Sequence, residues 1–271
     1  MPKYIDIHCH TNFQVFKEDY KDVIKRALRG DTWLINVGTQ ADTSQRAIEI
    51  AREYPEGVYA SIGLHPIHTG KSYHDEKELG EGGAEFTSRG EVFDHDTYLA
   101  LAKDPKTVAI GECGLDYYRT EPESIEKQKQ AFIAQIELAN EVGKPLMLHV
   151  RDAYEDTLEI LKKYAKVKGA VHFFVGTPAQ AKNFLDFGFM LSFTGVLTFT
   201  HDYDEVVKAA PLDMILNDTD SPYVAPVPHR GKQNEPAYIR EVTKRIAELK
   251  GISEEEAASA IMANARRLFK I

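Results

Sequence analysis

KYIDIHCH, at residues 3–10, is an apolar run that ends in two histidines, and it decides the fold. Its composition and length predict a β-strand, and the residues that follow it, HCHTN at 8–12, predict how the chain continues. An open doubly wound sheet normally has a glycine-rich turn after its first strand. Residues 8–12 contain no glycine, so they offer no phosphate cradle and favour a closed barrel instead.

Seven further apolar runs follow the first, so the eight runs cover residues 3–10, 33–38, 58–65, 108–116, 145–151, 169–174, 189–194 and 214–220. Helical patterns alternate with them at 42–53, 123–142, 154–164, 178–187, 204–209, 235–250 and 254–268. Gly30, Gly143 and Gly188 indicate helix ends. Eight strand-helix units predict an α/β fold, a (β/α)8 TIM barrel. We expect a single domain over 1–271, since about 250 residues are typical of that barrel.

The composition excludes several classes of protein. The net charge of −9 is not typical of a protein that coats nucleic acid, although bound cations allow a nuclease. Two cysteines are too few for a disulfide framework, and no apolar run has the roughly 20 residues of a membrane helix. The first residues also lack the apolar stretch of a signal peptide. We therefore expect a cytoplasmic protein with no membrane contact and no obligate protein partner.

The acidic charge is concentrated in one segment. Residues 71–96 hold eight acids and three bases, a net charge of −5, and they are rich in glycine without clear periodicity. This composition predicts a long solvated loop, an acidic insertion at about 70–96.

Polar residues gather where the predicted strands end. They are His8, His10, His65, Glu112, Asp116, His149, Arg151, His172, Asp218 and Asp220. The carboxyl ends of barrel strands meet at one face, where catalytic groups lie. Residues two apart on a strand share a side, so His8 and His10 point together while Cys9 faces the helices. The histidines at 68, 74, 95 and 201 fall outside this pattern, and we expect them at the surface.

Six of these residues are candidate metal ligands: His8, His10, Glu112, His149, His172 and Asp220. Imidazoles with carboxylates suit zinc, manganese, nickel or iron better than calcium. Six ligands exceed the need of one catalytic ion, and two ions about 3.5–4 Å apart would use them all, with Glu112 as the bridge. Taken singly, His-x-His is more often a core or surface pair, and Asp220 alone would suit a helix cap.

Six motifs carry a resemblance to a known family: HCH (8–10), GLHP (63–66), GECGLDYY (111–118), LHVRDA (148–153), DTDSPY (218–223) and RGKQNEP (230–236). Over essentially its whole length, the chain resembles the TatD-type metal-dependent deoxyribonucleases, within the amidohydrolase-like barrel enzymes.

The resemblance implies two divalent ions, with Mg, Mn, Zn and Ni as candidates. The ligands it implies for the first ion are His8, His10, Glu112 and Asp220. Those for the second ion are Glu112, His149 and His172. The substrate phosphates would be contacted by His65, Arg151, Arg230, Lys232 and Asn234.

Three positions depart from the family pattern. After His172 the family usually has Cys, Phe, Ser and Gly, whereas residues 173–176 are FFVG, so the polar serine is lost. Asp218 stands where the family usually has Glu. The acidic insertion is longer than usual, and as a lid on the catalytic face it would repel a nucleic-acid backbone.

The function predicted from these features is hydrolysis of phosphodiester bonds in DNA, by an exonuclease acting on single-stranded ends. The ions would activate a water, Asp220 would take its proton, and Glu112 would join the ions. The alternative is amide or ester hydrolysis, a deacylase acting on a small or aminoacyl substrate. A metal-binding protein without catalytic activity is the third possibility.

Overall fold

The computed structural model describes residues 2–70, 73–74, 86–87, 89–118 and 120–271. Eight parallel strands form one sheet in the order β1-β2-β3-β6-β7-β8-β9-β10. Their bounds are β1 Tyr4–Cys9, β2 Thr32–Val37, β3 Val58–Ile62, β6 Thr107–Asp116, β7 Leu146–Arg151, β8 Gly169–Val171, β9 Met190–Phe193 and β10 Ile215–Asn217.

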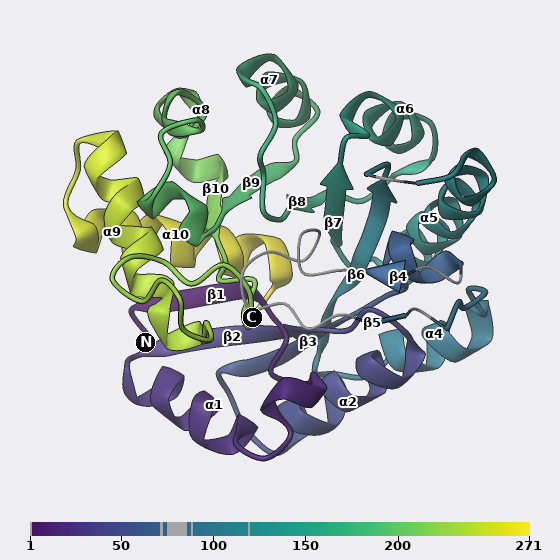
Figure 1. Ribbon diagram of the computed structural model, residues 1–271, viewed down its shortest axis with the longest axis horizontal. Helices are drawn as coiled ribbons and strands as arrows, with labels where there is room; N and C mark the ends of the chain where they lie inside the picture. Colours follow the sequence, from purple (N-terminus) through teal and green to yellow (C-terminus); the bar gives the residue numbers. More distant parts are fainter. Residues whose placement is uncertain (1, 71–72, 75–85, 88, 119) are drawn as a thin grey trace.

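The helices surround this sheet as a ring (Figure 1). They are α1 Tyr20–Arg29, α2 Ala41–Arg52, α4 His95–Ala102, α5 Pro122–Val142, α6 Tyr154–Tyr164, α7 Pro178–Asp186, α8 Asp204–Ala209, α9 Ile239–Lys250 and α10 Glu254–Phe269. Short 3₁₀ helices are η1 Gln14–Phe16, η2 Pro66–Thr69, η3 Gly195–Thr198, η4 Leu212–Met214 and η5 Pro236–Tyr238. In the described residues, no helix combines the length and apolar character that crossing a bilayer requires. The predicted TIM-barrel fold is confirmed.

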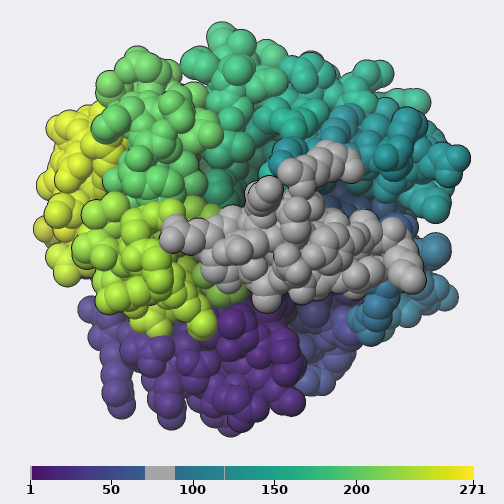
Figure 2. Space-filling view, viewed as in Figure 1, coloured from purple at the N-terminus to yellow at the C-terminus, as the bar shows by residue number. Residues whose placement is uncertain are grey.

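The chain closes the barrel just beyond its last strand. Asp220 N–H donates to the His8 carbonyl at 3.0 Å, and His10 N–H donates to the Ser221 carbonyl at 2.8 Å. Cys9 and Ser221 form an isolated parallel bridge. The yellow-green segment after β10 accordingly meets the purple N-terminal part on the viewed face (Figure 2). Closure therefore brings His8, His10 and Asp220 together.

The approach of β6 to β7 depends on two glycines. A Cβ atom on Gly111 would lie 2.2 Å from the Met147 carbonyl oxygen, and one on Gly114 would lie 2.1 Å from that of His149. Both glycines also have positive φ, +151° and +140°. Only glycine allows this contact, which sets the distance between Glu112 on β6 and His149 on β7.

Several element boundaries differ from those predicted. β8 ends at Val171 and β10 at Asn217, so His172 and Asp220 follow their strands instead of lying on them. The predicted helix at 235–250 is η5 followed by α9. Helices α1 and α4 had no predicted ranges; Gly30 marked only the end of α1.

The expected surface position of His68 is wrong. His68 lies in η2, and only 8% of its surface is exposed, because η2 packs against α5. His95 and His201 are exposed, as expected. The side chain of His74 lies outside the described residues.

Only part of the acidic insertion is described. Tyr73–His74 (β4) and Phe86–Thr87 (β5) pair antiparallel, and α4 begins at His95. Glu91 accepts hydrogen bonds from Tyr98 Oη at 2.6 Å and from Ala41 N–H at 3.3 Å, which ties residues 89–94 to α2 and α4. The expected lid comprises the whole insertion, about 70–96, of which residues 71–72, 75–85 and 88 lie outside the described part.

Candidate metal centre

His8 and His10 lie side by side where β1 ends, because strand residues two apart point to the same side. Their Nε2 atoms are 3.2 Å apart, and both side chains are almost completely buried. Asp220 Oδ1 lies 3.4 Å from His10 Nε2 and 3.8 Å from His8 Nε2. These three side chains form a group able to hold one ion.

A backbone carbonyl on the side away from the site fixes the orientation of the His10 ring. Its Nδ1 lies 2.9 Å from the Val37 carbonyl oxygen, which can only accept, so Nδ1 carries the hydrogen. Nε2 is then left with its lone pair directed at the site. The Phe13 ring stacks on the His10 ring at 4.2 Å and shields its outer side. This arrangement holds the imidazole in the form that binds a cation.

Glu112 lies between two groups of imidazoles. Its Oε1 is 2.8 Å from His172 Nε2, 3.0 Å from His149 Nδ1 and 3.2 Å from His65 Nε2. Its Oε2 is 3.3 Å from His8 Nε2, on the other side. One carboxylate therefore presents a different oxygen to each group, as a bridging carboxylate can.

The imidazoles keep Glu112 ionised. Burial opposes the charge, but the nearby His65, His172 and His8 outweigh it, so the pKa of this carboxyl is well below its usual range. The Glu112 carboxylate is therefore negative at neutral pH and can bind a cation.

The histidines themselves fall into two electrostatic types. Burial, with the positive charge of His172, lowers the pKa of His8 to about 4, so His8 is neutral near pH 7. Burial also opposes the charge on His149, but hydrogen bonds to Asp116 and Glu112 outweigh it and raise its pKa to about 9. A cation bound near His149 must therefore displace a proton.

The donor set fits divalent ions. The structure contains three groups of potential ligands, and within each group the ligand atoms lie within 4.8 Å of one another. The groups are His8, His10 and Asp220; His8, Glu112 and His172; and His65, Glu112 and His149. Imidazole nitrogens mixed with carboxylate oxygens are typical of zinc, manganese, nickel and iron sites. Each of the six predicted ligands belongs to at least one group.

Further carboxylates support the ligands from outside. Asp116 Oδ2 lies 2.9 Å from His149 Nε2, and Asp218 Oδ1 lies 3.8 Å from His172 Nδ1. Asp218 also accepts a hydrogen bond from Ser192 Oγ. The Asp116 contact orients the His149 ring, as carboxylates behind metal-bound imidazoles do.

Sequence analysis missed Asp6. This fully buried carboxylate accepts hydrogen bonds from His8 N–H and from both the N–H and the hydroxyl of Thr219. It joins β1 to the segment that carries Asp220. The signal was available, since residues 6, 8 and 10 share one side of the strand.

Two predicted substrate contacts lie near the ligands. His65 is only 6% exposed and belongs to a potential ligand group with Glu112 and His149. The Arg151 guanidinium lies over the Tyr118 ring at 3.8 Å from its centroid, at the end of β7. Arg151 is only partly buried, so it presents positive charge beside the site.

The segment at residues 230–234 divides into an exposed part and a buried part. Arg230 lies over the Phe199 ring at 4.0 Å and donates to the Ala225 carbonyl, while Lys232 is exposed. The predicted substrate contact of Asn234 does not fit, because Asn234 is completely buried. Its amide donates to the carbonyls of Thr219 and Tyr223 at 2.8 and 2.7 Å, and therefore holds the turn around Asp220.

A barrel with imidazoles and carboxylates converging at the carboxyl ends of its strands defines a metal-dependent hydrolase. The chain belongs to the TatD related DNase family, whose family model matches residues 5–270. The resemblance found in the motifs is thereby confirmed.

Relatives match along nearly the whole chain. An uncharacterized metal-dependent hydrolase, YabD of Bacillus subtilis, is 39% identical over 272 residues, covering 98% of each chain. The 3′-5′ ssDNA/RNA exonuclease TatD of Erwinia tasmaniensis is 34% identical over 276 residues, covering 98% of this chain and 99% of the relative. The crystal structure of YJJV, a TatD homolog from Escherichia coli, superposes with a TM-score of 0.84 at 27% identity, covering 99% and 98%.

Proposed function

We propose that this protein is an exonuclease that hydrolyses phosphodiester bonds at single-stranded DNA ends with two divalent ions. Residues 1–271 then act as one catalytic domain that carries the acidic insertion. The observation that supports it most directly is the position of Glu112, whose two oxygens face separate groups of imidazoles. A relative with 34% identity bears the name of a single-strand exonuclease.

The proposed ligands divide around Glu112. His8, His10 and Asp220 would hold the first ion with it, and His149 and His172 would hold the second. Two such ions supply Lewis-acid activation of a water molecule and neutralise charge on a phosphoryl oxygen. His65 is close enough to Glu112 to join the second group, in addition to its predicted contact with substrate.

Asp220 is the proposed general base. Burial disfavours its charge, but the neighbouring His10 imidazole and the positive charge of His172 outweigh burial, and the pKa of Asp220 is lowered. Asp220 is therefore ionised, and the carboxylate oxygen that does not face the histidines can accept the proton of an attacking water. The depressed pKa also favours rapid release of that proton.

The cationic side chains would bind the substrate backbone. Arg151 lies at the end of β7 beside the ligands, and its guanidinium can grip two oxygens of one phosphate. Arg230 and Lys232 lie in the segment after β10, and they suit a neighbouring phosphate. These positive groups offset the net charge of −9 where the polyanion would bind.

Hydrolysis of labelled single-stranded DNA tests the proposal. Protein stripped of metal with a chelator and reloaded with manganese or magnesium is expected to shorten the strand from one end. Asp220→Asn should lower the rate at least 100-fold, the usual contribution of a general base. Asp186→Asn, at an exposed position on α7, is the matched control and should retain the wild-type rate.

Two results would contradict the proposal. Hydrolysis of acyl substrates, with none of DNA in any of several metals, would favour the amide or ester hydrolase instead. Undiminished DNA hydrolysis after thorough chelation would remove the metal mechanism itself.

A further inference from the structure

A cavity of about 240 Å³ lies beside the candidate metal centre. Its wall is formed by the segment between β1 and α1, together with Tyr20 of α1 and Arg46 of α2. This dark purple segment lies between α1 and α2 at the lower edge of the ribbon view (Figure 1). The volume is slightly below the range of small-molecule sites, so it suits one small unit of a polymer.

The cavity is positively charged although the chain as a whole is acidic. Lys17 and Arg46 line it, and none of its lining residues is acidic. Within the described parts of the chain, Lys17 makes no ion pair, and Arg46 pairs only with Glu49, at 3.5 Å. The Arg46 guanidinium also lies over the Tyr20 ring at 4.8 Å. This lining suits an anion.

Asn12 adds a second, independent feature. It is 9% exposed and lines the cavity, and its Nδ2 donates to the carbonyls of Val37 and Thr43 at 3.1 and 3.0 Å. Because Nδ2 is committed to two acceptors, the orientation of the amide is fixed. Its Oδ1 is buried and has no hydrogen-bond partner among the described residues. A buried acceptor of this kind needs a donor, either an ordered water or a group of a ligand.

One ring, that of Phe13, separates the cavity from the metal centre. Phe13 lines the cavity with one part of its side chain, and its ring stacks on His10 at 4.2 Å. Thr11 and Asn12 directly follow His10 in the chain. A group bound in the cavity is therefore the neighbour of whatever binds at the metal centre.

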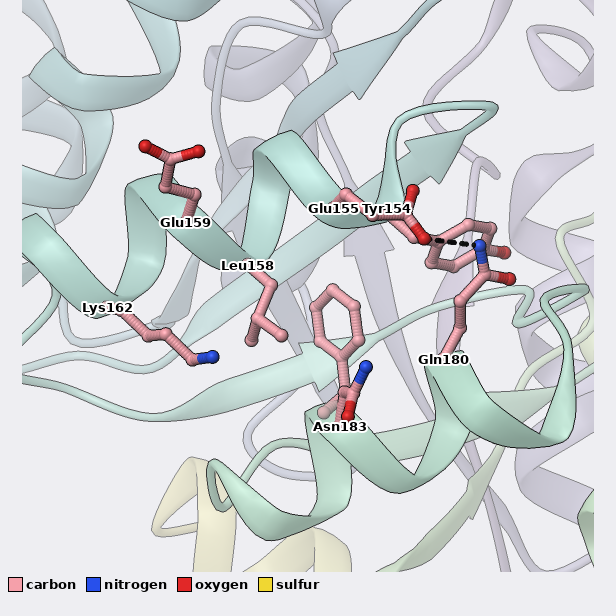
Figure 3. Close-up of a pocket in the computed structure, with 8 residues that line it drawn as sticks. Tyr154, Glu155, Leu158, Glu159, Lys162, Gln180 and Asn183 are labelled. Carbon is pink, nitrogen blue, oxygen red and sulfur yellow. Dashed lines mark hydrogen bonds between the residues drawn. The ribbon is translucent and has the colours of Figure 1, made fainter.

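A second surface pocket, between α6 and α7, has a different character. Tyr154, Leu158 and Asn183 line it, but so do Glu155 and Glu159 (Figure 3). Its two carboxylates outnumber its one cation, Lys162, and therefore disfavour an anion. The positive charge at the Lys17 cavity is therefore a local feature and not a property of every hollow on this protein.

We propose that the cavity lined by Lys17, Arg46 and Asn12 binds the nucleotide next to the one cleaved. Lys17 and Arg46 hold its phosphate, the rings of Phe13 and Tyr20 border its sugar or base, and Asn12 Oδ1 accepts a hydrogen from it. This subsite rests on the proposed nuclease function, because a polynucleotide places successive phosphates at neighbouring positions.

Binding of a labelled single-stranded oligonucleotide to chelator-treated protein tests the subsite without hydrolysis. Lys17→Ala and Arg46→Ala should each weaken binding about tenfold, the loss expected for one charge-assisted phosphate contact. Each should also make the slope of log K against log salt concentration shallower by about 0.7. Lys25→Ala is the control, since Lys25 lies on α1, pairs with Asp22 and does not line the cavity.

Competition against the oligonucleotide identifies the ligand class. Thymidine monophosphate should displace it at a lower concentration than inorganic phosphate, because only the nucleotide has a sugar and a base that can contact the rings of the cavity. Equal competition by the two would overturn the nucleotide assignment.

The outcomes separate this subsite from the proposed function. If metal-loaded wild-type protein hydrolyses DNA while both variants bind like Lys25→Ala, the subsite is wrong and the nuclease stands. If the variants lose binding but no metal restores DNA hydrolysis, the nuclease is wrong and the nucleotide site stands.

Discussion

Asn234 gives the sharpest test of how the chain holds its catalytic loop. Family resemblance predicts that Asn234 contacts substrate, whereas the structure buries it completely beneath the turn that carries Asp220. Its amide donates to the carbonyls of Thr219 and Tyr223, on either side of Asp220. The substitution Asn234→Ala leaves both carbonyl groups without their donor.

The expected loss of stability follows from those two bonds. A buried polar group that loses its partner costs about 1–3 kcal/mol; because the bond to Thr219 is buried and the bond to Tyr223 only partly so, we take about 2 and about 1 kcal/mol, a total of about 3 kcal/mol. For a domain of this size each kcal/mol corresponds to about 2–4 °C, which predicts a fall in Tm of about 6–12 °C. Because the turn around Asp220 relaxes, affinity for the first ion should fall at least tenfold.

Thermal unfolding and calorimetric metal titration measure both effects. Asn183→Ala, at an exposed position on α7, is the control and should change the Tm by less than about 2 °C. A variant with the wild-type Tm and metal affinity but a raised KM for DNA would refute this reasoning. It would restore the substrate contact that the sequence predicted.

Three further predictions test the barrel, the insertion and the ligand electrostatics. Gly114→Ala should lower the free energy of chemical unfolding by more than about 3 kcal/mol, because the new Cβ would lie 2.1 Å from the His149 carbonyl oxygen. Gly143→Ala, at a position with positive φ but open space, is the control and should lower it by about 1–2 kcal/mol. Tyr98→Phe removes the bond to Glu91 and should cost about 1–2 kcal/mol, with faster deuterium exchange at residues 89–94. The pKa of His149 is raised to about 9, so the protonated imidazole stabilises the metal-free protein, and this contribution is complete below pH 6.5. The free energy of unfolding in urea should therefore fall by roughly 1–3 kcal/mol as the pH rises through 9. A free energy that is flat or rising over this range would contradict the assignment.

The sequence predicts the strands and the ligands for one physical reason. Buried parallel strands are continuous apolar runs, and polar residues directly after such runs must lie at one face of the barrel. His8, Glu112 and His149 were found in this way, and the structure brings them together. Helices were predicted less completely. Helix α4 was not predicted, because its eight residues follow a strongly acidic segment that masks their helical periodicity.

The sequence alone did not predict the long-range hydrogen bonds. Asn234 lies 15 residues from Thr219, and Asp6 lies 213 residues from it, yet both bind that residue. The spacing of residues 6, 8 and 10 places Asp6 on the side of the histidines, but no periodic signal identifies Thr219 as the partner of Asp6 or Asn234, because both contacts depend on how the barrel closes. From the sequence alone, a side chain that stabilises a turn carrying a ligand therefore cannot be distinguished from one that contacts substrate.

Backbone conformation at the strand ends completes the site. Asp152, Phe173 and Asp220 follow β7, β8 and β10, and all three have φ between +45° and +55°. Such a conformation is unfavourable for residues other than glycine, and it persists only where surrounding contacts enforce it. At Asp220 those contacts are its own N–H bond to the His8 carbonyl and the Asn234 bonds that flank the turn. The left-handed turn directs the carboxylate back toward His10, whereas an extended chain would carry it past the site. The candidate metal centre therefore depends as much on how the barrel closes between β10 and β1 as on the candidate ligands themselves.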